Sequence, residues 1–349
     1  MRVFRCDCCG HRVPFGGQTC GTCGAALGYV SDDRTVRSLL PPNDSATYEI
    51  VGHDGRWWRC MNSAWGCNWM LTAGSDTVWC RSCRLTRGRP DSERTDAVKA
   101  WLTAEAAKRR LVHQLDTVGL LVETRSTSTP DGLVFDLVHL PGERGITGHF
   151  DGVVTLDLAE ADDRYRDALR RQLGEPFRTV IGHLRHEVGH YFWARLVGRT
   201  NCLSSFRDVF GDERINYRES VAAYYSGDAA SWDAGRHVTA YAASHPLEDW
   251  AETFAHYLHI VDAAETAAAH ELVPADAGVA VAETLANGDF DVLLDVWRPI
   301  NVALTAIAES VGSAAIYPFE PNGDVVDKLA FVHRQVAAIQ IVNAPMTAR

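Results

Sequence analysis

Residues 179–193 decide the fold and read TVIGHLRHEVGHYFW. As a helix, this stretch places His186 and His190 four residues apart on one face. Two imidazoles at that spacing can hold one Zn²⁺ ion, with Glu187 close to the water molecule that the metal activates. Chance gives roughly 0.03 matches to this His-Glu-x-x-His pattern in a chain of this composition.

The residues around this motif favour a helix over 176–197. Proline is tolerated in the first turn of a helix, so Glu175-Pro176 is the predicted start, and Gly198 is the predicted stop. His183 lies on a neighbouring face, and we interpret it as a packed or capping histidine rather than a ligand. An apolar stripe with helical spacing comprises Ile181, Leu184, Val188, Phe192 and Leu196.

A catalytic zinc needs a third protein ligand, and the candidates follow Pro246. A helix that begins at Pro246 stacks Glu248, Glu252 and His256 on one face at four-residue spacing. Three ionisable side chains in line on an apolar helix are costly unless they are paired or bind a metal. By spacing alone, either Glu248 or Glu252 could be the ligand. Asp212-Glu213 competes weakly, because it fits a solvated face.

The 349 residues allow two or three domains, and the composition is that of a soluble globular protein. The chain contains no run of 18 apolar residues and no apolar signal region at its start, so we expect a cytoplasmic protein without a membrane partner. Thiols stay reduced in the cytoplasm, so clustered cysteines favour metal sites over disulfides.

Nine of the ten cysteines lie before residue 84 and form two groups. The first group has two Cys-x-x-Cys-Gly turns, in which glycine allows the tight turn and four thiolates close a tetrahedral site. The ten residues between these turns leave space for a short hairpin. We predict a zinc ribbon over 1–40, although Cys8 competes as a ligand. The predicted zinc ligands are Cys6, Cys9, Cys20 and Cys23.

The second group predicts another four-thiolate zinc module over 41–90. Its members are Cys60, Cys67, Cys80 and Cys83. Cys80 and Cys83 form a knuckle, but the spacing of the first two is looser than usual, so one knuckle plus two core thiols is the alternative. Residues 38–45, with their two prolines, are interpreted as a linker between the modules.

Residues 1–90 contain 11 Arg, no Lys and 7 acidic residues, whereas the remainder contains 23 basic and 38 acidic residues. This contrast indicates either an anionic partner or two domains docked by opposite charge. Five tryptophans near the second cysteine group could stack on single-stranded nucleic acid, but we favour a role in the small core. They are Trp57, Trp58, Trp65, Trp69 and Trp79.

Residues 91–349 have mainly helical periodicity. Two strands are expected, over 133–138 and 153–158. The second is either the place where a peptidase pairs with extended substrate by strand addition or an ordinary strand within a sheet. Helices are expected over 96–121, 162–173, 176–197, 208–225, 236–243, 246–264, 276–286, 289–310 and 324–342.

The pattern Tyr-x6-Glu-x-x-Ala-Glu after His-Glu-x-x-His resembles the metallopeptidase domain of anthrax lethal factor, a gluzincin. The resemblance implies that Glu248 ligates zinc, that Glu252 orients a ligand histidine and that Tyr241 stabilises the oxyanion.

Nearly the whole chain also resembles bacterial zinc-binding metallopeptidases with an N-terminal zinc-ribbon region. This resemblance rests on the motifs Cys6-x-x-Cys9-Gly10, Cys80-Arg-Ser-Cys83-Arg84-Leu85, Thr147-Gly148-His149, Glu160-Ala161-Asp162, Gly182-His183-x-Arg185-His186-Glu187-x-Gly189-His190-Tyr191 and His245-Pro246-x-Glu248-Asp249-Trp250-Ala251-Glu252.

The sequence thus predicts an α+β protein, with small β-rich zinc modules before a predominantly helical, zincin-like metallopeptidase domain. The expected cofactors are one catalytic and two structural zinc ions. The expected reaction is hydrolysis of an intracellular protein or peptide, with Glu187 as general base. The alternative is a zinc-stapled protein- or nucleic-acid-binding protein with an inactive peptidase-like domain.

Overall fold

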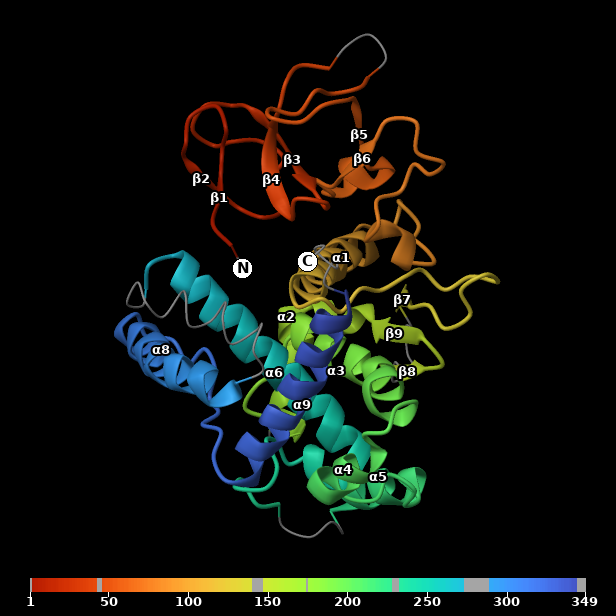
Figure 1. Ribbon diagram of the computed structural model, residues 1–349, viewed down its shortest axis with the longest axis vertical. Coiled ribbons are helices and arrows are strands. Elements are labelled where there is room, and N and C mark those ends of the chain that lie inside the picture. The colour runs from red at the N-terminus through yellow and green to blue at the C-terminus, as the bar shows by residue number, and fades with distance from the viewer. Residues whose placement is uncertain are drawn as a thin grey trace, which may run out of the picture.

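The computed structural model describes residues 2–42, 46–139, 147–173, 175–227, 232–272 and 289–343. Within them, a small β-rich head lies at one end of the molecule and a larger, mainly helical domain forms the rest (Figure 1). The predicted α+β class is confirmed.

Three antiparallel hairpins build the described part of the head. They pair β1 (Phe4–Arg5) with β2 (Arg12–Val13), β3 (Ala26–Val30) with β4 (Thr35–Leu39), and β5 (Trp57–Arg59) with β6 (Met70–Thr72).

The position of the first hairpin differs from the prediction. Strands β1 and β2 flank the first cysteine knuckle instead of filling the space between the two knuckles. The knuckle itself reverses the chain, because the Gly10 amide donates to the Cys6 carbonyl and Gly10 has a φ of 72°. The predicted linker also begins too early, since Ser38 and Leu39 belong to β4.

The two cysteine modules pack on each other through polar contacts. The Gln18 side chain donates to the carbonyls of Ser63 and Cys67, and the Asn68 side chain donates to those of Phe15 and Gly17. The tryptophans contribute to this small core. Trp57 and Trp69 are buried, and Arg89 lies over the rings of Trp65 and Trp79.

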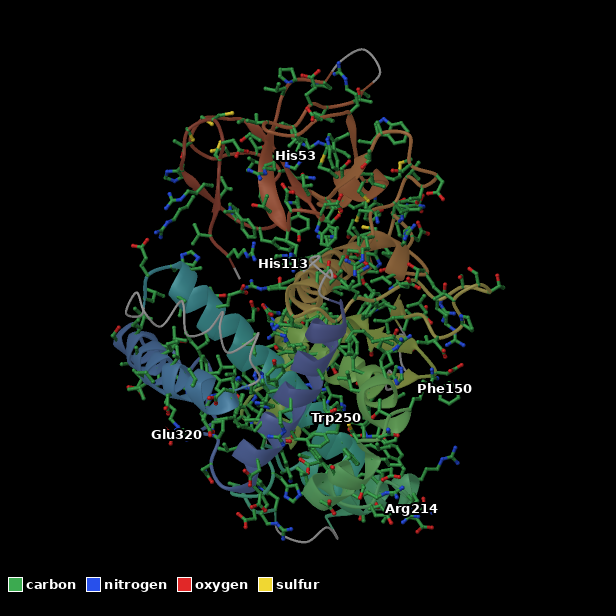
Figure 2. All side chains as sticks on the ribbon, viewed as in Figure 1. His53, His113, Phe150, Arg214, Trp250 and Glu320 are labelled. Atoms are coloured by element: carbon green, nitrogen blue, oxygen red, sulfur yellow. The ribbon has the colours of Figure 1, made fainter. Side chains whose placement is uncertain are left out.

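The head rests on helix α1 (Thr95–Thr117), where Figure 2 labels His113. Tyr29 Oη and His113 Nδ1 are 2.8 Å apart, with the rings of Phe4 and Phe15 beside the imidazole. Arg81 of the head pairs with buried Asp116 of α1 at 2.6 Å. Opposite charges therefore contribute to the contact between the basic head and the acidic domain.

A three-stranded sheet with the order β7-β9-β8 lies beside the helices (Figure 1). Strand β7 (Val134–Val138) pairs in parallel with β9 (Val153–Asp157), and β8 (Gly148–Phe150) pairs antiparallel with β9. Because β9 has neighbours on both sides, it cannot receive a substrate strand. Of our two interpretations of residues 153–158, strand addition is wrong and the ordinary sheet strand is correct. Within the described residues, β8 is the edge strand next to the metal-binding motif, and Figure 2 shows Phe150 at its outer end.

The described helices of the large domain correspond broadly to the predictions. They are α2 (Asp163–Leu173), α3 (Val180–Trp193), α4 (Leu203–Phe210), α5 (Tyr217–Ser226), α6 (Pro246–Ala269), α8 (Phe290–Ser310) and α9 (Asp324–Asn343). The helix expected over 276–286 lies outside the described residues.

Three of the predicted helices differ from the structure for local reasons. Helix α3 begins at Val180 rather than Pro176, because the Thr179 hydroxyl caps it by accepting from the Gly182 amide. The helix predicted over 208–225 is broken after α4 at Gly211, whose φ is 98°. Over 236–243 the chain forms turns, with a short 3₁₀ turn at Ala242–Ser244.

Candidate metal centre and catalytic cleft

Helices α3 and α6 carry the candidate metal ligands and cross at a point where both have small residues. A Cβ added to Gly189 would lie 3.1 Å from the Ala251 Cα, and Trp250 Nε1 donates to the Gly189 carbonyl at 2.9 Å. The helices run antiparallel, because His186 contacts Glu252 whereas Gly182 faces His259. This close crossing brings Glu248 of α6 to the two motif histidines of α3.

The ligand atoms of His186, His190 and Glu248 converge on one point. The two Nε2 atoms are 3.2 Å apart. Glu248 Oε2 lies 3.0 Å from His186 Nε2 and 3.4 Å from His190 Nε2. Ligands bound to zinc at about 2.0–2.1 Å are about 3.3–3.4 Å apart at the corners of a tetrahedron. The triangle therefore has the size that a zinc ion requires.

The chemistry of these atoms also fits a cation. His186 Nδ1 lies 2.6 Å from Glu252 Oε1, so His186 can donate its Nδ1 hydrogen there and use Nε2 to bind a metal. Glu248 Oε2 is buried and lacks a hydrogen bond of acceptable geometry. Three lone-pair atoms that face one another in a buried place repel each other unless a positive charge lies between them.

Glu252 is held on both carboxylate oxygens, which suits an orienting role. Besides accepting from His186, it accepts from the Thr239 hydroxyl at 2.8 Å on Oε2. Burial opposes its ionisation, but the contact with His186 lowers the pKa of Glu252 to about 2. The geometry thus places Glu248 among the candidate ligands and Glu252 behind His186.

The sequence analysis did not find Tyr217, which contacts Glu248. The Tyr217 hydroxyl donates to Glu248 Oε1 at 2.6 Å, which leaves Oε2 facing the histidines. Tyr217 is the first residue of α5, and no local pattern connects it with a glutamate 31 residues later. Thr239 was missed for the same reason, since it lies in the turns before α6.

Glu187 and Tyr241 line the same cavity as His186. Burial raises the pKa of Glu187, and the negative charges of Glu248 and Glu252 act in the same direction. The Tyr241 ring lies 6.0 Å from the His186 ring and contacts Tyr224 at 5.4 Å, measured between ring centroids. Burial also raises the pKa of Tyr241, so its hydroxyl keeps its proton as a hydrogen-bond donor.

Two other histidines lie close to this centre. His183 lines the cavity but does not belong to the ligand cluster, in agreement with our interpretation of it as a packed residue. His149 of β8 stacks on His190 with a centroid separation of 6.3 Å and accepts a hydrogen bond from the Gly152 amide. The sheet edge is therefore adjacent to the candidate metal site.

The eight predicted cysteine ligands form two clusters in the head. In the first, Cys6 and Cys23 are 3.6 Å apart and Cys9 and Cys20 are 3.7 Å apart, measured between sulfur atoms. Thiolates bound to zinc at about 2.3 Å are about 3.8 Å apart in a tetrahedron. Cys8 is exposed and lies outside the cluster.

The second cluster is more deeply buried than the first. Cys67 lies 3.7 Å from both Cys80 and Cys83, and Cys60 completes the group. The Cys80 amide donates to the Cys60 sulfur and the Cys83 amide donates to the Cys80 sulfur. These hydrogen bonds stabilise the thiolate forms. The structure therefore favours a second four-thiolate site over the alternative of two core thiols.

A pair of helical histidines facing a glutamate on a second helix defines the class of zinc-binding metallopeptidases. The chain belongs to the family described as "putative zinc-binding metallo-peptidase", whose family model matches residues 97–335. A zinc-ribbon domain family matches residues 3–94, so zinc binding is supported for both parts of the chain.

The chain is 38% identical to uncharacterized proteins of Mycobacterium tuberculosis and Mycobacterium bovis. Each alignment extends over 338 residues and covers 96% of this chain and 95% of the mycobacterial protein. No solved structure is significantly similar to the chain. Among the described helices, none has the length and apolar character needed to cross a bilayer.

The three clusters lead to a prediction of metal content. We expect about three zinc ions per chain, lost to a chelator in a fixed order. The His186 site should empty first because one coordination position is left for water. The Cys6 cluster should follow because two of its thiols are exposed, and the fully buried Cys60 cluster should empty last.

Elemental analysis of the purified protein during a chelator titration measures this content and order. Cys67→Ala should lower the count by one, whereas Cys202→Ser, which removes a thiol outside both clusters, should leave it unchanged. A count of about one zinc in the untreated chain would contradict the assignment of three sites.

Proposed function

We propose that this protein is a zinc-dependent peptidase that hydrolyses peptide bonds of a protein or peptide substrate. The observation that carries the proposal is the convergence of His186 Nε2, His190 Nε2 and Glu248 Oε2, with Glu187 beside them in one cavity. Three protein ligands leave a fourth position open, as catalytic zinc sites require.

The proposed mechanism assigns one task to each side chain. When bound, zinc would lower the pKa of a water molecule to about 7 and polarise the substrate carbonyl. Glu187 accepts the proton of the attacking water on its carboxylate and later donates it to the leaving amine. Tyr241 donates a hydrogen bond to the oxygen on which negative charge develops.

Other residues hold this arrangement in place. Glu252 orients His186, and Tyr217 fixes the carboxylate plane of Glu248. We further propose that an extended substrate pairs with the edge strand β8, because β8 carries His149 next to His190.

Zinc-dependent cleavage tests the function directly. Zinc-loaded protein should cut a complex mixture of peptides, a strong chelator should abolish the cutting, and added zinc should restore it. Mass spectrometry of the new peptide ends gives the measurement. Cleavage that persists after all the zinc is removed would contradict the proposal, as would a fully zinc-loaded chain that cuts none of the peptides.

A further inference from the structure

A cavity of about 240 Å³ adjoins the candidate metal centre and is lined by residues of α3, α5 and α6 and of the segments that precede α3 and α6. Side chains of the proposed mechanism, His186, Glu187, Tyr241 and Glu252, form one part of its wall. The remaining wall has no task in peptide hydrolysis itself, so its chemistry bears on which substrate the cavity accepts. It includes Glu175, Arg178, Tyr224, Tyr225, Trp232 and His256.

One part of this wall is the carboxylate of Glu175, which has one oxygen that can still accept a hydrogen bond. Arg178 binds both oxygens of Glu160, at 2.6 and 3.2 Å, and its remaining terminal nitrogen donates to Glu175 Oε2 at 2.7 Å. The single guanidinium therefore serves two carboxylates, which leaves this group with an excess negative charge. Glu175 lines the cavity and is partly exposed, and its second oxygen has no described partner.

Aromatic side chains line the same cavity as this carboxylate. The rings of Tyr224 and Tyr225 are 5.3 Å apart and nearly perpendicular, and both residues line the cavity together with Trp232. Burial raises the pKa of both tyrosines, and the charge of Glu175, which lines the same cavity, acts in the same direction. Aromatic faces next to a carboxylate bind cations well.

The inner end of the cavity is polar but uncharged. Burial lowers the pKa of His183 to about 3 and that of His256 to about 4, so both are neutral at physiological pH. His259 Nδ1 lies 2.5 Å from Arg185, which can only donate, so His259 carries its hydrogen on Nε2. These histidines therefore do not offset the negative charge of the wall.

The charges around the cavity sum to an excess of negative charge. Arg185, which lies beside His259, is offset by Asp262 at 2.8 Å. A divalent ion in the metal centre and Arg178 would together offset three of the five remaining carboxylates. These carboxylates belong to Glu160, Glu175, Glu187, Glu248 and Glu252. An acidic substrate group is therefore repelled from the cavity, and a cationic group is attracted to it.

We propose that this cavity binds a cationic group of the substrate next to the cleaved bond, with Glu175 as its partner and Tyr224 and Tyr225 as its aromatic walls. The cation is either a lysine or arginine side chain or the α-ammonium group of a terminal residue. The proposal rests on the proposed peptidase function and deepens it by naming the substrate chemistry.

Cleavage profiles of the full-length, zinc-loaded protein test this selectivity. The substrates are synthetic peptides with both ends blocked, in which each amino acid type occurs in turn beside every other. We expect cuts next to lysine or arginine, and Glu175→Gln should reduce these cuts about ten- to a hundredfold relative to cuts between neutral residues. The control Glu309→Gln removes the same charge from an exposed position on α8 and should leave the profile unchanged.

Two further arms distinguish the source of the cation. Acetylation of the lysine side chains should abolish cutting if the side chain is bound. Cutting that instead requires an unblocked N-terminus, and still depends on Glu175, identifies the α-ammonium group. Cutting without preference for any cation, or equal profiles for Glu175→Gln and the wild type, would overturn the proposal while leaving the peptidase function intact.

A binding measurement keeps the inference testable without turnover. Fluorescein-labelled lysine and arginine peptides are titrated with the zinc-loaded Glu187→Gln protein, and their anisotropy is compared with that of alanine peptides. We expect the Glu187→Gln protein to bind the basic peptides more tightly than the alanine peptides. The double variant Glu187→Gln, Glu175→Gln should lose this preference. If no peptide is ever cleaved, the proposed function fails, but this binding preference or its absence still decides the cavity chemistry.

Discussion

Replacing Glu187 with glutamine should lower peptidase turnover by about 10²–10⁴-fold without loss of bound zinc. Glutamine has nearly the same size and can still hydrogen bond to a water molecule, but it cannot accept a proton at neutral pH. Glu187 is not among the three converging ligand atoms, so the metal site does not need its charge. The measurement is turnover of a cleavable peptide, with zinc content and melting temperature determined on the same samples.

Glu309→Gln provides the matched control, because it makes the same chemical change outside the cleft. Tyr241→Phe should give a smaller loss, mainly in kcat, because its hydroxyl acts on charge that develops only in the transition state. An unchanged rate in Glu187→Gln, with zinc still bound, would contradict the mechanism and favour a binding protein with an inactive peptidase-like domain.

The second large effect separates the two glutamates of α6. Glu248→Ala should empty the catalytic site, because it removes one of three protein ligands and leaves two histidines with no third partner. Glu252→Ala should leave the site able to bind zinc but lower the affinity by about 10–100-fold, since His186 loses the acceptor that orients it. Competition with a chromophoric chelator measures both affinities.

Glu252→Gln is the conservative control for this comparison. Its amide oxygen can still accept the hydrogen of His186 Nδ1, so zinc affinity should stay closer to that of the wild type than in Glu252→Ala. The opposite pattern, with an empty site in Glu252→Ala and a filled one in Glu248→Ala, would reverse the assigned roles.

The sequence predicted those parts of the site that depend on spacing along one helix. His186, Glu187 and His190 follow from a single motif, and the structure brings the first and last of them together on α3. Spacing did not separate Glu248 from Glu252, because both face the same way on α6. That choice depends on how two helices cross, which is determined by Gly189 and Ala251 in different parts of the chain.

The errors in the fold arose where a tertiary contact or a single turn overrides a local pattern. Pro176 suggested the start of α3, but the Thr179 cap starts the helix one turn later, and residues 175–178 form the wall of the cavity. Strand β9 has the hydrophobic pattern of a strand, but no pattern within it reveals that β7 and β8 flank it on both sides.

The crossing of α3 and α6 also constrains how this chain can change during evolution. A Cβ at position 189 would lie 3.1 Å from the Ala251 Cα, so even alanine there requires α6 to shift slightly, and a larger side chain would strain the crossing that brings Glu248 to the histidines. Glu175, Tyr224 and Tyr225 of the cavity wall lie outside the crossing of α3 and α6 that positions the metal ligands. Under the proposed function, substitutions at these wall residues can therefore change the accepted substrate without disturbing the contact between Gly189 and Ala251.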